Sequence, residues 1–225
     1  MNISDILLGA AIIIAAPAVN RVGEAKAQQI HPDQVVVDSP FVHDPVLAYE
    51  NGKYYLYSTG HGISQMTSAD RKHWTLCREG VLKNHEIPAW THDSVPGFHT
   101  HIWAPDVIHY RNKWYLAYSC STFGKNTSAI GLLSNTSLAN MNGWKDEGCI
   151  LASEGKRDNW NAIDPNFVID DKGNPWMAWG SFWDGIQLVK LDKKTMHVKK
   201  GAKPQTIARR HAFGDASAEL NPTSK

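Results

Sequence analysis

The chain has 225 residues, which is enough for one sizeable domain with a substantial core. Its 23 basic residues nearly balance its 22 acidic residues, so the composition excludes the basic stripe of a nucleic-acid-binding protein and the acidic run of a disordered tail. A neutral or modestly charged ligand is favoured, and we predict no nucleic-acid partner.

The N-terminal segment differs in kind from the rest of the chain. Residues 6–19 are almost wholly apolar, and Ala25-Lys26-Ala27 follows as a small-x-small cleavage pattern. The apolar stretch has the length of a signal-peptide core and is short for a membrane span. We therefore predict a signal peptide over residues 1–27, a secreted or periplasmic location, and no membrane association after cleavage. Asp5 and the lack of a leading Lys or Arg are atypical of a signal, and a short buried helix is the alternative.

Three segments then share one plan, with a period close to 60 residues. Each reads as a strand, a tight turn and a second strand, because short runs rich in Val, Ile, Tyr and Trp flank turn residues that tolerate positive φ. The segments run over residues 43–58, 104–119 and 163–180, with turns at Asn51-Gly52, Arg111-Asn112 and Lys172-Gly173-Asn174. An aspartate lies near the start of each segment, at Asp44, Asp106 and Asp164.

Two further strands are expected in each unit. In the first two units they fall at residues 63–67, 74–78, 128–134 and 144–150. Four-stranded antiparallel units that repeat radially form a β-propeller, and an open β-solenoid is the less favoured alternative. We predict an all-β fold with a linker over residues 28–38, a propeller domain over 39–213 and a frayed tail over 214–225.

The repeated aspartates are the first candidates for function. The first strand of a propeller blade lines the central channel, so aspartates at the starts of these strands would converge on one ligand. The alternative is that each aspartate only orders the turn before its strand. For Asp106 we weigh the two interpretations equally.

Four ordered motifs carry a resemblance to a known family. They are His43-Asp44-Pro45, the run from His101 to Val107, the run from Trp160 to Asn166, and the run from Trp179 to Gly185. Over residues 39–210 the chain resembles the five-bladed propeller enzymes of glycoside hydrolase family 43, and within it the endo-1,5-α-L-arabinanases. The resemblance implies hydrolysis of internal α-1,5 bonds of arabinan with inversion, so arabinan or an arabino-oligosaccharide is the implied partner.

The same resemblance assigns roles to two carboxylates. Asp44 matches the general base that activates water, and Asp164 matches the carboxylate that raises the pKa of the general acid and orients it. An inverting hydrolase needs one ionised carboxylate beside the water and one protonated acid beside the leaving oxygen. A neighbouring negative charge keeps the acid protonated, which is a reason for a third carboxylate that is independent of the family.

Further positions match the family's substrate contacts. The implied substrate-binding residues are Trp103, Gly124, Asn161, Ala162, Ile163, Ser181, Phe182 and Trp183. Residues 161–163 would touch the sugar through backbone or amide groups, and Trp103 either forms a cleft wall or packs between blades.

The match also implies parts that this sequence does not show. The family's general acid is a Glu in an Ile-Glu-Ala/Gly-Pro type motif about 60 residues after the position of Asp164, and Glu219 lacks that motif. About three blades of five are represented, an incomplete ring, and we expect negligible hydrolysis from the chain as given. No cofactor is required, although an axial calcium or other ion is implied by the family, and its His ligand is not found here.

Three alternatives remain open. The first is an exo-acting β-xylosidase or α-L-arabinofuranosidase of the same family, and the second is a non-catalytic carbohydrate-binding remnant. The third is a metal protein, based on His99 and His101 with His85 and His92 nearby, although no third ligand has a metal-type spacing and we predict no metal site. Cys77, Cys120 and Cys149 are either buried thiols, which we prefer, or include one disulfide whose pair the sequence does not choose.

Overall fold

The computed structural model describes residues 34–209. By its internal contacts the chain divides into two compact units, Met1–His31 and Pro32–Lys225, and the described residues all belong to the second. The predicted signal peptide 1–27 and the predicted tail 214–225 lie outside the described residues.

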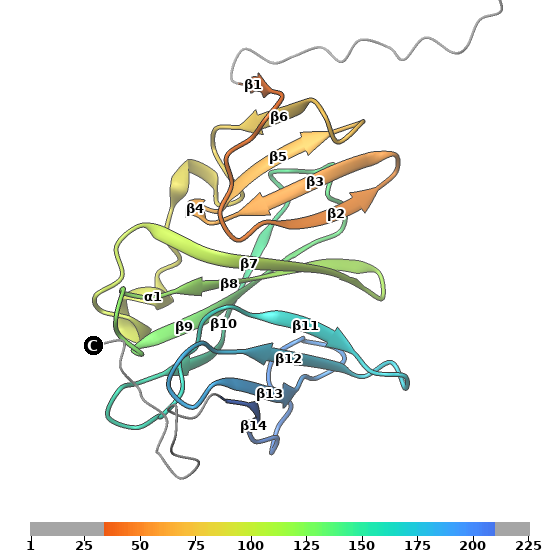
Figure 1. The fold of residues 1–225 in the computed structure, drawn as a ribbon. Helices are drawn as coiled ribbons and strands as arrows, with labels where there is room; N and C mark the ends of the chain where they lie inside the picture. Colours follow the sequence, from red (N-terminus) through yellow and green to blue (C-terminus); the bar gives the residue numbers. More distant parts are fainter. Residues whose placement is uncertain (1–33, 210–225) are drawn as a thin grey trace, which may run out of the picture. The chain divides into compact units, whose positions relative to one another are not determined.

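Strands dominate the described part of the chain, and they form three antiparallel sheets (Figure 1). The first has the order β1-β6-β5-β3-β2, the second β10-β9-β8-β7-β4, and the third β11-β12-β13-β14. The bounds are β1 Gln34–Val37, β2 Val46–Glu50, β3 Lys53–Ser58, β4 Gly60–His61, β5 Ser64–Ser68, β6 Trp74–Cys77, β7 His101–Tyr110, β8 Lys113–Cys120, β9 Ser128–Asn135, β10 Lys145–Ser153, β11 Asn166–Ile169, β12 Pro175–Trp179, β13 Ile186–Lys190 and β14 Gln205–Ala208. A short 3-10 helix, η1 (Lys83–His85), and the helix α1 (Trp90–Ser94) connect the first sheet to the second.

The strand–turn–strand units expected from the repeat are confirmed, and the all-β propeller architecture with them. Glu50 pairs with Lys53, which leaves Asn51 and Gly52 as a two-residue turn with φ values of 49° and 82°. Positive φ at both central positions is the turn geometry that matches the twist of a hairpin. The structure adds β1, which lies within the expected linker 28–38, because its three consecutive valines pair with β6.

Two apolar cores separate the three sheets. The side chains of β8 alternate between them, since Trp114, Leu116 and Tyr118 face the first sheet while Tyr115 and Ala117 face the third. A strand that is buried on both faces reads as a continuous apolar run, as β8 does. The second sheet is therefore packed on both sides, and β7 contacts β2 on one side and β11 on the other (Figure 1).

Polar bridges tie neighbouring sheets together at the strand ends. Glu50 accepts hydrogen bonds from Trp114 Nε1 at 2.7 Å and from the Ser137 hydroxyl at 2.7 Å, which joins the first sheet to the second. The Tyr110 hydroxyl donates to the carbonyl of Gly173 at 2.9 Å and joins the second sheet to the third. These bonds fix how the first strands of successive sheets lie against each other.

The structure corrects the alignment of the repeat. Asp44, Ala104 and Asp164 each precede a proline, are spaced 60 residues apart, and have φ values of 49°, 41° and 54°. Asp106 lies two residues further along, inside β7. Ala104 is therefore the counterpart of Asp44 and Asp164. Asp106 lies near the same turn but at a different position of the repeat, so its match to the other two aspartates is coincidental.

Candidate active site

Asp44 is held at the start of β2 by a hydroxyl group. Its Oδ2 accepts a hydrogen bond from Thr59 Oγ1 at 2.7 Å and lies 2.8 Å from His43 Nδ1. Thr59 Oγ1 also accepts the backbone N–H of Ala104 at 2.9 Å, so its own proton points to Asp44. Oδ2 is thereby occupied, while Oδ1 has no protein partner among residues 34–209 and the side chain is 40% exposed. One carboxylate oxygen of Asp44 is left to face water.

Asp164 lies in the same electrostatic environment although it is 120 positions further along the chain. Partial burial first, and then the negative charge of Asp44, raise the pKa of Asp164 to about 6, while His43 acts in the opposite direction. Like charges resist ionising together, so the effect of the Asp44 charge on the pKa of Asp164 indicates that the two carboxyl groups lie near each other. Two of the predicted catalytic residues are thus brought together.

Asp164 and Ala104 are held by equivalent contacts. The Ser119 hydroxyl accepts the backbone N–H of Asp164 at 3.0 Å, as Thr59 accepts that of Ala104. In both cases the donor follows 45 residues after the hydroxyl. A non-glycine residue with positive φ directly before a proline is disfavoured, and such strain is maintained where the surroundings over-determine it, often at functional sites. The hydroxyl contacts provide that restraint.

Asp106 has a structural role. Its Oδ2 accepts the backbone N–H of Phe167 at 2.6 Å and lies 3.4 Å from Asn166 Nδ2, which joins β7 to β11. Burial raises the pKa of Asp106, and the hydrogen bonds act in the opposite direction. Of the two interpretations weighed for this residue, ordering the local structure is the one that these contacts support.

The segment 161–163, which directly precedes Asp164, is buried and held by hydrogen bonds. Ala162 is fully buried and its N–H donates to the Ser153 hydroxyl at 2.9 Å. Asn161 is 3% exposed and its Nδ2 donates to the carbonyl of Lys125 at 3.3 Å. The carbonyl of Ile163 accepts the N–H of Gly180 at 2.8 Å. The N–H of Ala162 is thus already bonded and its side chain is enclosed, and a sugar contact at this residue stays a prediction.

Four of the other predicted substrate contacts lie on loops, and the fifth, Trp103, lies in β7. Gly124 is exposed with φ of 73° and follows β8. Phe182 is 67% exposed, and Trp183 beside it is half-buried, with φ values of 55° and 36°. Ser181 and Trp103 are also half-buried, and Trp103 is the register partner of Ser119. These five residues have surface available for a ligand, whereas the segment 161–163 is buried.

Three residues of the candidate site were not identified from the sequence. Thr59 and Ser119 occur 60 positions apart, a signal that the repeat contained. Phe41 is 96% exposed three positions before Asp44.

All three cysteines are free thiols, and burial raises the pKa of Cys149 to about 11.

Metal ligation finds little support in the described part of the chain. Within residues 34–209, no group of three His, Cys, Asp or Glu side chains is arranged to hold a metal ion. The described residues therefore do not fit the axial ion that the family implies, and that ion stays a prediction.

Comparison with known protein families shows to which family the chain belongs. The model of the family Glycosyl hydrolases family 43 matches residues 34–216. The chain belongs to this family. Within family 43, the chain is 44% identical over 159 residues to the extracellular endo-α-(1→5)-L-arabinanase 1 of Bacillus subtilis, which covers 69% of this chain and 48% of that protein. It is also 44% identical over 154 residues to the extracellular exo-α-(1→5)-L-arabinofuranosidase ArbA of Cellvibrio japonicus, over 67% of this chain and 44% of that protein.

Solved structures of family 43 agree with the fold. An exo-1,5-α-L-arabinanase from a bovine ruminal metagenomic library superposes with a TM-score of 0.72 at 52% identity, over 79% of this chain and 58% of that one. The α-L-arabinanase of Cellvibrio cellulosa complexed with arabinohexaose superposes with a TM-score of 0.70 at 37% identity, over 81% and 58%. The chain spans about half the length of the curated relatives it matches. None of the helices in the described ranges is long and apolar enough to cross a membrane.

Proposed function

We propose that this chain contributes the general base and a modulating carboxylate to a secreted hydrolase that cuts internal α-1,5 bonds of arabinan with inversion. The observation that carries the proposal is the pairing of Asp44 with Asp164 through their charges, with one oxygen of Asp44 held by Thr59. Related family members are named for endo- and exo-acting arabinan hydrolysis, and two of them are named extracellular.

In the proposed reaction, the free Oδ1 of Asp44 takes a proton from water while the water oxygen attacks the anomeric carbon. The bond from that carbon to the leaving oxygen breaks, and a general acid protonates the leaving oxygen. That acid is not assigned to a residue of this sequence. With a pKa of about 6, Asp164 is mostly ionised at neutral pH, so its charge can keep a nearby acid protonated.

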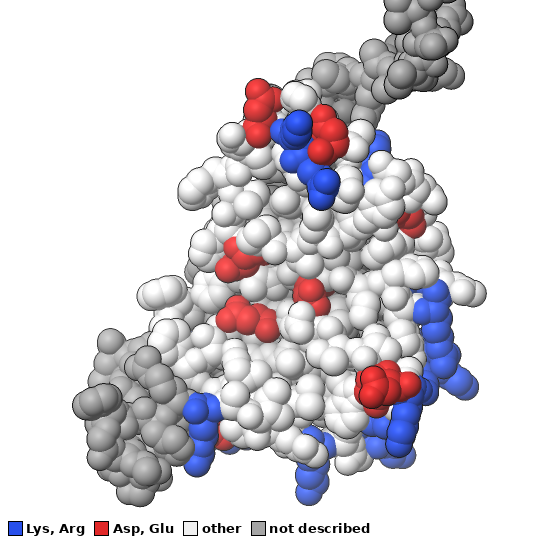
Figure 2. Space-filling model, turned by 45° about the vertical axis from the view of Figure 1, so that its right-hand side comes forward, with Lys and Arg blue, Asp and Glu red and all other residues white. Residues whose placement is uncertain are grey.

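The surface charge fits a neutral polymer. Figure 2 shows a face on which isolated acidic side chains lie in a broad area without Lys or Arg, whose side chains lie toward the margins. Exposed aromatic rings at Phe123 and Phe182, 91% and 67% exposed, offer apolar faces for sugar rings. A neutral arabinan chain needs no strong field of either sign.

A substrate that does not need an acid tests the base directly. The leaving group of a 2,4-dinitrophenyl α-1,5-arabinobioside departs without protonation, so its release reports the step assigned to Asp44 alone. We expect release from this bioside, little release from the matching β-xyloside, and binding of linear arabinohexaose measured by calorimetry. Equal release from both glycosides would favour an exo-acting enzyme of other specificity, and binding without any release would favour a binding remnant.

A further inference from the structure

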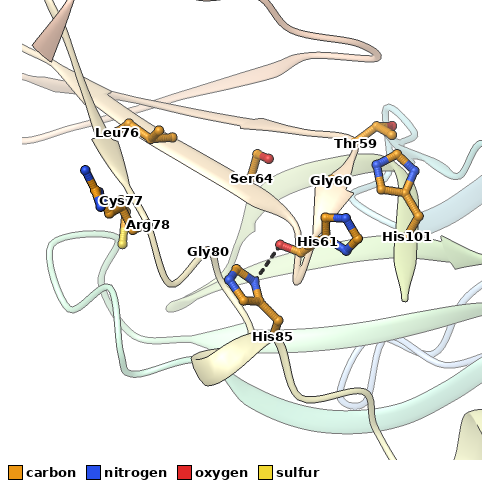
Figure 3. A pocket seen from close by; sticks show the side chains of 10 residues that line it. All are labelled: Thr59, Gly60, His61, Ser64, Leu76, Cys77, Arg78, Gly80, His85 and His101. Carbon is orange, nitrogen blue, oxygen red and sulfur yellow. Dashed lines mark hydrogen bonds between the residues drawn. The ribbon is translucent and has the colours of Figure 1, made fainter. Parts of the chain in front are cut away.

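Thr59 lines a second feature besides the contact with Asp44. It forms part of an open pocket of about 450 Å³ whose walls come from β4, β5, β6 and β7 and from the segments after β6 and η1. Figure 3 shows three imidazole rings gathered toward one end, with Leu76, Cys77 and Arg78 at the other. The pocket therefore adjoins the position assigned to the general base.

The three imidazoles come from different elements and lie close together. His61 on β4 and His101 on β7 are register partners with ring centroids 5.2 Å apart, and His85 lies 6.4 Å from His61. His85 Nδ1 lies 2.9 Å from the carbonyl oxygen of His61, so it donates a hydrogen bond to that oxygen (Figure 3). The Nε2 atom of His85 takes no part in this bond. The rings of His61 and His101 have no hydrogen-bond partner within the described chain, and all three residues are exposed.

The wall that carries these rings is fixed by close backbone contacts. The N–H of Val81 lies 3.0 Å from the carbonyl oxygen of Gly62, and a Cβ on Gly62 would meet the ring of His85 at 2.9 Å. A side chain on Gly60 would collide with the Ser64 hydroxyl, so glycine there keeps that hydroxyl at the surface of the pocket.

The charge of the pocket is one-sided. Among residues 34–209, the titratable groups that line it are the three imidazoles, the thiol of Cys77 and the guanidinium of Arg78, and no carboxylate is among them. Hydroxyl and imidazole donors around one anionic group are the chemistry that recognises a carboxylate.

We propose that this pocket binds the carboxylate of a uronic acid unit in the polysaccharide. The placement of that unit beside the cleaved bond rests on the proposed function, because Thr59 links the pocket to Asp44. The binding chemistry itself does not depend on hydrolysis. The pocket would then select polymers that carry acidic sugars near the arabinan backbone.

Histidine-detected NMR tests the proposal on the whole chain. We expect D-galacturonate to shift the side-chain resonances of His61, His85 and His101, and D-galactose to shift none of them. His101→Gln removes one of the three imidazole rings and should weaken galacturonate binding about tenfold or more. His109→Gln is the matched control, since His109 is an exposed histidine on the same strand whose ring packs on Trp114, and it should bind galacturonate normally.

Three results would overturn the proposal. They are the absence of shifts with galacturonate, equal shifts with acetate at the same concentration, and unchanged affinity in a folded His101→Gln variant. Release from the dinitrophenyl bioside is measured separately. Galacturonate binding without that release would count against the proposed hydrolysis alone, whereas release without galacturonate binding would count against the pocket alone.

Discussion

The hydroxyl oxygen of Thr59 lies 2.7 Å from Oδ2 of Asp44, and the backbone N–H of Ala104 supplies that oxygen with its second hydrogen bond at 2.9 Å. The N–H can only donate, so the hydroxyl proton is directed to the carboxylate. This contact fixes which of the two carboxylate oxygens of Asp44 remains free. Several expected outcomes depend on it.

Thr59→Val keeps the shape of the side chain and removes the hydroxyl. A hydrogen bond to a charged group contributes about 1.5–3 kcal/mol, so we expect kcat on the dinitrophenyl bioside to fall about 10- to 100-fold with little change in KM. Thr59→Ser should restore most of the activity. Thr206→Val is the matched control, because Thr206 donates to Asp184 at 3.0 Å in another sheet, and it should leave kcat near the wild-type value.

Asp44→Asn should lower the pKa of Asp164. The charge of Asp44 is one of the two causes that raise this pKa to about 6, and asparagine carries no charge. The first-ranked cause, burial, remains, so the pKa should stay above the ordinary value of 3.8. A ¹³C NMR titration of the aspartate carboxyl carbons measures it. An unchanged value would show that the two carboxyl groups do not sense each other.

Asp164→Asn should stabilise the fold at pH 7.5. Because the pKa of Asp164 is raised in the folded state, its contribution to stability is fully present below about pH 4 and is lost as the pH rises through about 6. The neutral amide avoids that loss. The residue is exposed at its surface, so solvent screening limits the gain to about 1 kcal/mol. Urea denaturation at pH 4 and pH 7.5 checks it, and a gain that is equal at both pH values would contradict the electrostatic cause.

Asp106→Ala should cost stability without removing a catalytic group. It leaves the buried N–H of Phe167 without its 2.6 Å acceptor, which costs about 1–3 kcal/mol. Asp106→Asn should cost less because it keeps an acceptor oxygen. Asp171→Ala, at an exposed position, is the control for loss of a carboxylate and should leave the urea midpoint unchanged. If Asp106→Asn lowered kcat by more than its loss of folding stability explains, Asp106 would have a second role in catalysis.

Most of the fold was readable from the sequence because its signals are local. The Asn51-Gly52 turn and the alternating runs around it fix a hairpin without help from distant residues. Strand β4 was not predictable, since two residues, Gly60 and His61, form it only by pairing with β7 some 40 positions later. The same limit applied to β1, whose pairing partner β6 is remote in sequence.

The sequence predicted that Asp44 and Asp164 occupy equivalent positions, and it did not predict the contacts that the hydroxyls of Thr59 and Ser119 make with them. Spacing alone placed Asp44 and Asp164 on equivalent turns. It also grouped Asp106 with them, because the presence of an aspartate near a turn does not show which residue has positive φ. The constant spacing of the Asp-Pro and Ala-Pro pairs was the better guide. That Ala162 is enclosed depends on Ser153 in the preceding sheet, which no local pattern reveals.

The configuration of the first-formed sugar tests the central claim, that Asp44 activates water beside Asp164, most directly. Proton NMR on the dinitrophenyl bioside within the first turnovers, before the anomers equilibrate, should show the β-anomer, with Asp44→Asn slowing its release at least about 100-fold. Asp184→Asn should release it at the wild-type rate. An α-anomer as first product, or undiminished release by Asp44→Asn, would contradict the assignment.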